Sequence, residues 1–151
     1  MEKLLILIFS ITVMSCSTTK TNNTSKKNTE EVILNSNRLH DIWVVKELFR
    51  EKLQNISDET RKQITLEIFT NDMKILGNDG CNNFFGKIIK VDASKISFTS
   101  IGSTKKMCPH METSNNFYKA MNDITNYRLE KTYLYLLDAN NNELLKLLKV
   151  D

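Results

Sequence analysis

The residues of this 151-residue chain that could do chemistry gather around two of its three cysteines. Cys81 stands in the stretch GNDGCNNFFG, and Cys108 stands in TKKMCPHM, two residues before His110. A thiol nucleophile needs a base that lowers its pKa or takes its proton, usually a histidine held by a third group. His110 could reach Cys81 if the two cysteines meet, but no Asn or Asp is marked out as the third group. Thiol catalysis is therefore a minor hypothesis.

The same segment contains metal donors. Those that would suit copper or zinc are Met107, Cys108, His110 and Met111, with Cys81 as a fifth. A closed zinc site, however, generally has two well-separated ligand pairs. Here the donors form one dense cluster beside a proline that begins a helix, where Met111 is more simply a core residue. We expect neither a metal nor another cofactor.

The N-terminus, MEKLLILIFSITVMSC, is typical of a signal peptide. Its apolar run from Leu4 to Met14 is too short to cross the hydrocarbon layer, which takes about 20 apolar residues. Residues 13–16 look like the lipobox of bacterial lipoproteins, in which Cys16 receives diacylglycerol and becomes the mature N-terminus. By resemblance to enterobacterial sorting, Ser17 rather than Asp after this cysteine favours the outer membrane. We therefore expect a signal peptide over residues 1–15.

Residues 16–37 would connect the lipid to the folded part. The stretch STTKTNNTSKKNTEE is polar and lacks aromatic residues, so it cannot bury enough surface to fold and is expected to be a flexible tether. A lipidated Cys16 on such a tether is a coherent anchor, since acyl chains gain about 0.8 kcal/mol per buried methylene. The expected location is the bacterial cell envelope, at the outer membrane.

Cysteine counting bears on the choice between nucleophile, metal ligand and structural clamp. If Cys16 carries lipid, Cys81 and Cys108 form an even pair in a compartment where disulfides persist. A bridge would close a loop of about 28 residues, worth roughly 3–4 kcal/mol in the chain-entropy model. We predict this disulfide, while the distance between the two Cα atoms has to come from the structure.

Composition favours one globular domain over residues 38–151. The apolar fraction of 40% and the charged fraction of 26% are ordinary for a folded chain, and the length suits a single core. The net charge of +3 is not gathered into a long basic run, so we do not expect nucleic acid as a partner. The expected partners are the membrane, through the lipid anchor, and an envelope protein. The domain itself is expected to be a monomer.

Short apolar segments predict a β-rich domain. The predicted strands lie in LHDIWVVKELF, KQITLEIF, MKIL, GKIIKVD and SKISFTSI, with turns at Asn71-Asp72 and at residues 92–94. Between the third and fourth of them, residues 77–80 predict a tight turn with positive φ angles. After this turn we expect Asn82 to bond nearby backbone and one of Phe84 and Phe85 to enter the core.

A helix and two final strands complete the prediction. Pro109 suits a first helical position, and the apolar residues that then recur at helical spacing are Phe117, Ala120, Met121 and Ile124. We predict one amphipathic helix over residues 109–125, followed by strands at 133–137 and 144–150. The fold class is mainly β (α+β), with a small antiparallel, barrel-like sheet of about six or seven strands and the helix before the last two.

Several of these features together resemble the META domain of bacterial HslJ-like lipoproteins. They are Trp43 in the first strand, the run Gly80-Cys81-Asn82 with Gly86, the run TKKMCP with Thr104 and Cys108, and the closing YLYLLDANNNELLKL. The resemblance covers residues from Leu39 to the end. The family often has Met-Ala before the second cysteine, so any role of that methionine does not transfer to Lys106 and Met107. The resemblance implies a compact β-rich fold with the two cysteines near each other, an envelope or stress-related role, and no catalytic residues.

The remaining candidates have simpler structural interpretations. The aromatic residues Phe84, Phe85, Tyr133 and Tyr135 are expected in core or cross-strand packing rather than in a ligand pocket. Glu30-Glu31 and Asp58-Glu59 are expected to be solvated charges, and Lys26-Lys27 and Lys105-Lys106 to be exposed. The leading hypothesis is a non-enzymatic, lipid-anchored envelope protein that binds another protein or an envelope component. The alternative is a small-ligand or metal-binding module that uses the mouth of the barrel.

Overall fold

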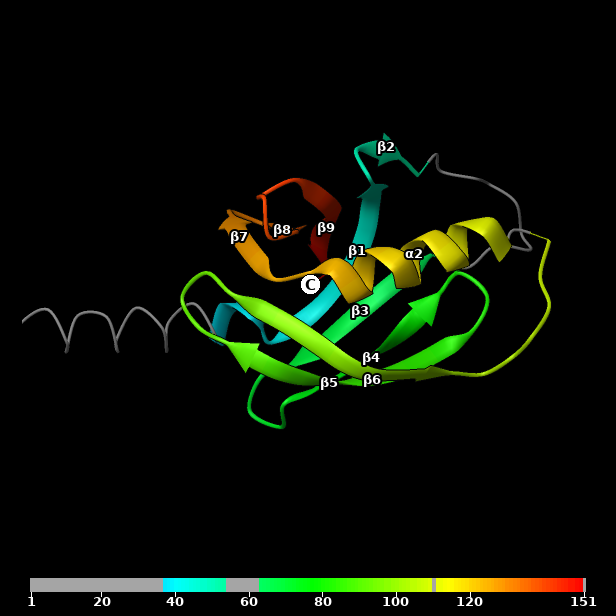
Figure 1. Ribbon diagram of the computed structural model, residues 1–151, viewed down its shortest axis with the longest axis horizontal. Helices are drawn as coiled ribbons and strands as arrows, with labels where there is room; N and C mark the ends of the chain where they lie inside the picture. Colours follow the sequence, from blue (N-terminus) through cyan, green and yellow to red (C-terminus); the bar gives the residue numbers. More distant parts are fainter. Residues whose placement is uncertain (1–36, 54–62, 110, 151) are drawn as a thin grey trace, which may run out of the picture.

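The computed structural model describes residues 37–53, 63–109 and 111–150 (Figure 1). In chain order the elements are β1 (Asp41–Leu48), β2 (Glu51–Lys52), β3 (Ile64–Phe69), β4 (Lys74–Asp79), β5 (Asn83–Val91), β6 (Ile96–Ser103), α2 (Met111–Asp123), β7 (Asn126–Glu130), β8 (Tyr133–Leu137) and β9 (Glu143–Val150). Several predictions fall outside the described residues, namely the signal peptide, Cys16 and the tether as far as residue 36, Asp58-Glu59 and His110.

The strands form one curled sheet in the order β6-β5-β4-β3-β1-β9-β8-β7, with β2 paired to β1. In Figure 1, β3–β6 and β7–β9 lie on either side of β1, and α2 lies along the open side. The two outermost strands meet where each begins, because Ile96 N donates to the Thr125 carbonyl at 3.2 Å and Tyr127 N donates to the Ser94 carbonyl at 2.8 Å. The fold is an antiparallel half-barrel, mainly β as predicted, with more strands than expected.

Alternation along the strands places the core on the concave face of the sheet. In β3 the buried residues are Ile64, Leu66 and Ile68, as the sequence pattern predicts. Trp43 lies opposite Leu66 on the same face and is 1% exposed. Its indole N–H donates to the Leu39 carbonyl at 3.0 Å, so this buried ring has its polar atom paired.

Helix α2 packs its apolar face into the half-barrel. The helical spacing predicted that face correctly, because Phe117, Ala120 and Met121 are fully buried and Ile124 is 2% exposed. Three strands follow the helix rather than the predicted two, since residues 126–130 form β7. Within the described ranges, no helix has both the length and the apolar character that crossing a membrane requires.

Strand β4 extends further than predicted and takes in Gly77 and Asp79. The predicted turn is therefore shorter, and of its two glycines Gly80 has the positive φ, at 93°. Gly77 has a packing role instead. A Cβ at this position would lie 2.1 Å from the carbonyl oxygen of Thr65 and 2.6 Å from the ring of Phe84. The missing side chain of Gly77 thus gives Phe84 its place in the core.

We predict that Gly77→Ala lowers the free energy of unfolding by about 2–3 kcal/mol, because the added methyl group meets the backbone of a paired strand. Gly102→Ala is the matched control. A Cβ there would lie 2.7 Å from the Phe85 ring, but that ring is 60% exposed and can turn away. Urea denaturation of both variants checks the prediction, and an equal loss in the two would contradict it.

Candidate functional site

Residues of the predicted motif converge where β4 ends, β5 begins and the segment after β6 returns. We call this region the motif corner and define it as Asp79, Gly80, Cys81, Asn82, Thr104 and Cys108. Cys81 and Cys108 form a disulfide with their Cα atoms 6.0 Å apart, a normal separation for such a bond. The predicted clamp is confirmed. Neither sulfur is a free thiolate here, so the nucleophile hypothesis is wrong for this state of the protein.

Asn82 holds the segment after β6 against the turn. Its side-chain oxygen accepts hydrogen bonds from the Thr104 hydroxyl at 2.8 Å and from the Lys106 amide at 2.7 Å. Its side-chain N–H donates to the Lys106 carbonyl at 3.3 Å. The prediction that Asn82 bonds nearby backbone was wrong, because these partners lie 22 and 24 residues away. Asn82 and Thr104 therefore secure the same loop that the disulfide secures.

The organising residue of the motif corner is Asp79, which faces the core and is 1% exposed. Its Oδ1 accepts the backbone N–H groups of Cys81 at 2.8 Å and Asn82 at 2.5 Å. Its Oδ2 accepts the hydroxyl groups of Ser114 and Tyr118, the latter at 2.7 Å. A single carboxylate thus joins the turn, the clamped cysteine and helix α2.

Two opposing effects act on the pKa of Asp79. Burial by itself would raise this pKa, because it disfavours the charged form. Hydrogen bonds from the Asn82 amide, Ser114, Tyr118 and the Cys81 amide outweigh burial and hold the pKa below its usual value. Burial also raises the pKa of Tyr118, and the neighbouring Asp79 raises it further. Asp79 is therefore a charged structural group that solvent and substrates do not reach.

Sequence reasoning missed the structural role of Asp79 and the hydroxyl group of Ser114 that donates to it. Asn78, Asp79 and Gly80 are typical turn residues, and this composition concealed the strand. The available signal was the alternation of Ile75, Gly77 and Asp79, which places the aspartate on the core face if β4 is continued.

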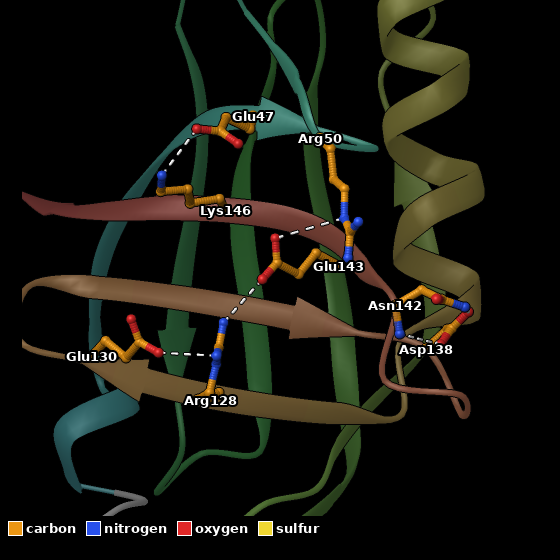
Figure 2. A network of polar contacts seen from close by, with 8 residues as sticks. All are labelled: Glu47, Arg50, Arg128, Glu130, Asp138, Asn142, Glu143 and Lys146. Atoms are coloured by element: carbon orange, nitrogen blue, oxygen red, sulfur yellow. Dashed lines mark hydrogen bonds and ion pairs between the residues drawn. The ribbon is translucent and has the colours of Figure 1, made fainter.

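The convex face of β7, β8 and β9 carries a separate polar network (Figure 2). Arg128 contacts Glu130 and Glu143 at 3.0 Å each, and Lys146 contacts Glu47 at 3.0 Å. The cations also lie over the rings of two tyrosines, with Arg128 at 4.3 Å from the Tyr135 centroid and Lys146 at 5.1 Å from that of Tyr133. Ion pairs at a protein surface each contribute little to stability, so the network gives the sheet modest support. Both tyrosines pack across strands as predicted.

The metal hypothesis finds little support in the parts of the chain that can be described. No group of three or more His, Cys, Asp and Glu side chains lies close enough to hold an ion there. Met107 is 88% exposed. Met111 is half-buried at the start of α2, so the expectation that it belongs to the core was wrong. His40 packs edge-on against Phe69, with ring centroids 5.5 Å apart.

A concave site lies at the mouth of the half-barrel, away from the motif corner. We call it the mouth pocket. It has a volume of about 290 Å³ and is lined by Asn37, Arg38, Asp41, Trp43, Leu129, Lys131 and Lys149. Asp41 pairs with Ile68 at the end of β3, whereas Asp79 pairs with Ile64 at its beginning. The mouth pocket and the motif corner therefore lie toward opposite ends of this strand.

We predict that Asp79→Asn lowers the free energy of unfolding by about 3 kcal/mol near neutral pH, because an amide cannot accept all four hydrogen bonds. The matched control is Asp138→Asn. That carboxylate accepts the backbone N–H groups of Asn140 and Asn142 in an exposed turn, so its loss should cost much less than the loss of Asp79. Urea denaturation at about pH 7 compares the two variants, and equal costs would contradict a special role for Asp79.

A comparison of the wild type with Asp79→Asn also gives a pH test. The pKa of Asp79 is lower in the folded state than the usual 3.8, so its charge stabilises the fold above that value. This stabilisation is lost as the pH falls through the lower folded-state pKa. The difference in unfolding free energy between the wild type and Asp79→Asn should therefore be complete at about pH 6 and shrink below about pH 4. A difference that grows toward low pH would contradict a lowered pKa.

The disulfide closes a loop with a sequence separation of 27 residues. We predict that the double variant Cys81→Ser/Cys108→Ser loses about 3–4 kcal/mol of unfolding free energy. Reduction of the wild type with dithiothreitol should produce a similar loss and should leave the double variant unchanged. Mass spectrometry without reductant should show the linked peptide in envelope-purified protein, and two free thiols there would refute the clamp.

Comparison with known proteins agrees with this architecture. The family model described as the META domain matches residues 37–151. A protein from Burkholderia xenovorans, solved by NMR, superposes with a TM-score of 0.59 at 20% identity, over 78% of this chain and 87% of that one. A second NMR structure has a TM-score of 0.58 at 19% identity, over 76% and 93%. These two likenesses concern the fold alone, and no curated protein matches the sequence. Since the family model spans the whole half-barrel, the chain belongs to the META domain family.

Proposed function

We propose that this chain is a lipid-anchored, non-enzymatic binding module of the bacterial cell envelope. The observation that carries the proposal is the Cys81–Cys108 disulfide, because such bonds persist in oxidising compartments outside the cytosol. The sequence supplies the matching export signal and lipobox at residues 1–16. The bond and the leader point to the same compartment by independent arguments.

The buried polar groups support binding rather than catalysis. Asp79 is 1% exposed and Ser114 is 2% exposed, and the two are bonded to each other. The side-chain oxygen of Asn82 accepts hydrogen bonds from Thr104 and Lys106, which lie in the loop after β6. A catalytic group has to reach a substrate, whereas these groups are used to hold the fold. The surface, rather than this polar corner, is therefore where we place the function.

The partner surface that we propose is an apolar strip on the convex face of β4 and β5. We define the strip as Leu76, Phe85 and Ile89, which are 38%, 60% and 61% exposed. Leu76 pairs directly with Phe85 across the two strands, and Lys74 pairs with Lys87 on the same face. On this face Lys87 lies between Phe85 and Ile89, whereas Lys74 is engaged by Asp72 at 2.9 Å. Apolar side chains with such a lysine among them complement a protein groove that has an apolar floor and a carboxylate. An envelope protein with such a groove is the partner that this charge pattern favours.

The test uses the full chain expressed in a bacterial host, with a photo-crosslinking residue at position 85. We expect mature protein in the membrane fraction, with Cys16 at its N-terminus and carrying lipid, and Cys16→Ser should abolish both lipid and membrane attachment. Crosslinking should yield one protein, attached at a peptide that contains Asp or Glu beside apolar residues. A crosslinker at Ile42, which is 45% exposed on β1, is the matched control and should not yield it.

Two outcomes would overturn the proposal. If the wild-type protein stays soluble and its Cys16 is unmodified, the proposed lipid anchor is contradicted. The proposed protein partner is contradicted if the crosslinker at position 85 reacts only with phospholipid. It is also contradicted if positions 85 and 42 yield the same crosslinked products.

A further inference from the structure

The mouth pocket contains a lysine where the strand pattern calls for a core residue. Lys149 pairs directly with Trp43, so it lies on the concave face, in the same row as the fully buried Leu147. Its Nζ lies 2.8 Å from Asp41 Oδ2, and the other oxygen of Asp41 accepts the Ile42 amide at 2.8 Å. One wall of the pocket is thus formed by this ion pair, whose lysine side chain is 38% exposed.

The rim of the pocket adds two more cations. Arg38 lies just before β1 and Lys131 lies in the turn between β7 and β8. With Lys149 they make three positive charges against the single carboxylate of Asp41, so the lining has a net charge of +2. The carboxylate of Asp41 is already engaged by Lys149 and by a backbone amide. The excess positive charge therefore belongs to the rim and faces whatever enters.

The floor of the pocket is apolar and rigid. Trp43 and Leu129 contribute to it, and the indole of Trp43 is held by its hydrogen bond to the Leu39 carbonyl. The volume of about 290 Å³ is at the lower end of the usual range for small-ligand sites. A ligand that fits has a small body that enters the pocket above Leu129 and the edge of the buried Trp43, and an anionic group that meets Arg38 and Lys131.

We propose that the mouth pocket binds the phosphate group of a small phosphate ester, in the size class of glycerol phosphate. A phosphate monoester carries close to two negative charges near neutral pH, which match the excess charge of the lining. The guanidinium of Arg38 can bind two phosphate oxygens at once, and Lys131 adds a point charge. This inference rests on the proposed binding function but not on the lipid anchor or on the apolar strip.

Trp43 provides a local readout, because it is the only tryptophan of the chain and lines the pocket. The full chain in a neutral detergent is titrated with glycerol 3-phosphate while tryptophan fluorescence is recorded. We expect a saturable change at millimolar concentrations or below. Arg38→Gln/Lys131→Gln should weaken the apparent affinity by at least about tenfold, since two charge-assisted contacts are lost. Lys119→Gln, which removes an exposed lysine of α2 that lines neither the mouth pocket nor the apolar strip, is the matched control and should bind as the wild type does.

A second series distinguishes the source of the phosphate. Vesicles of phosphatidylcholine with phosphatidic acid are compared with pure phosphatidylcholine vesicles and with free glycerol 3-phosphate. A response to the acidic vesicles indicates that the phosphate belongs to a lipid headgroup. A response to the soluble ester alone indicates a free metabolite. Either result supports the phosphate site. Cys16→Ser protein should behave like the wild type in the soluble titration even if the anchor proposal fails.

The inference would be overturned by a fluorescence change that potassium chloride reproduces at equal ionic strength. It would also fall if the double variant bound as tightly as Lys119→Gln, or if no saturable change occurred up to about 10 mM, far above the concentrations at which a specific site is used. Thermal unfolding of the double variant checks that the fold is intact, and an unchanged midpoint is expected because both residues lie on the rim.

Discussion

A carboxylate can stay charged inside a small core only if its oxygen atoms are hydrogen-bonded, and Asp79 imposes this condition on the domain. Two backbone N–H groups reach one oxygen only if residues 79–82 turn tightly, which the positive φ of Gly80 allows. Two hydroxyl groups reach the other oxygen only if α2 crosses at this point. The turn, the position of Cys81 and the placement of the helix thus follow from the needs of one side chain.

The features that were predicted correctly from the sequence are mainly those that follow a periodic pattern of apolar residues. The alternation of β3, the apolar face of α2 and the pairing of Cys81 with Cys108 were all accessible, because burial with period 2 or 3.6 and cysteine counting are local or arithmetic signals. The end of β4 was missed, since the turn-like composition of Gly, Asn and Asp concealed the alternation of Ile75, Gly77 and Asp79. β7 was missed because the stretch NYRLE alternates too briefly to stand out. The bonds of Asn82 to Lys106 depend on tertiary distance, which spacing along the chain does not contain.

The motif that marks the family and the site that we propose for phosphate have different physical purposes. In the motif corner, Asn82 accepts the Thr104 hydroxyl and Gly80 supplies the positive φ of the turn, so these residues hold the fold together. The lining of the mouth pocket instead has a net positive charge, because Asp41 is the one carboxylate among three cationic side chains. Trp43 is the residue that the two descriptions share, since it belongs to the motif and also forms the pocket floor. The motif residues thus hold the scaffold together, while Arg38 and Lys131 lie on the rim of the pocket and can be substituted without disturbing the motif corner.

The contact between β6 and β7 also affects the tendency of this protein to aggregate. Strand edges with unpaired N–H and C=O groups invite pairing with other chains, which leads to aggregation. Here the beginnings of the two outermost strands bond to each other, and α2 contacts β6 along the opening. Further along, β6 has irregular register and Ser100 has a φ of 54°, which interrupts a regular edge. Two neighbouring molecules therefore find little continuous strand to extend, so the curled sheet can be present at high local density without forming fibres.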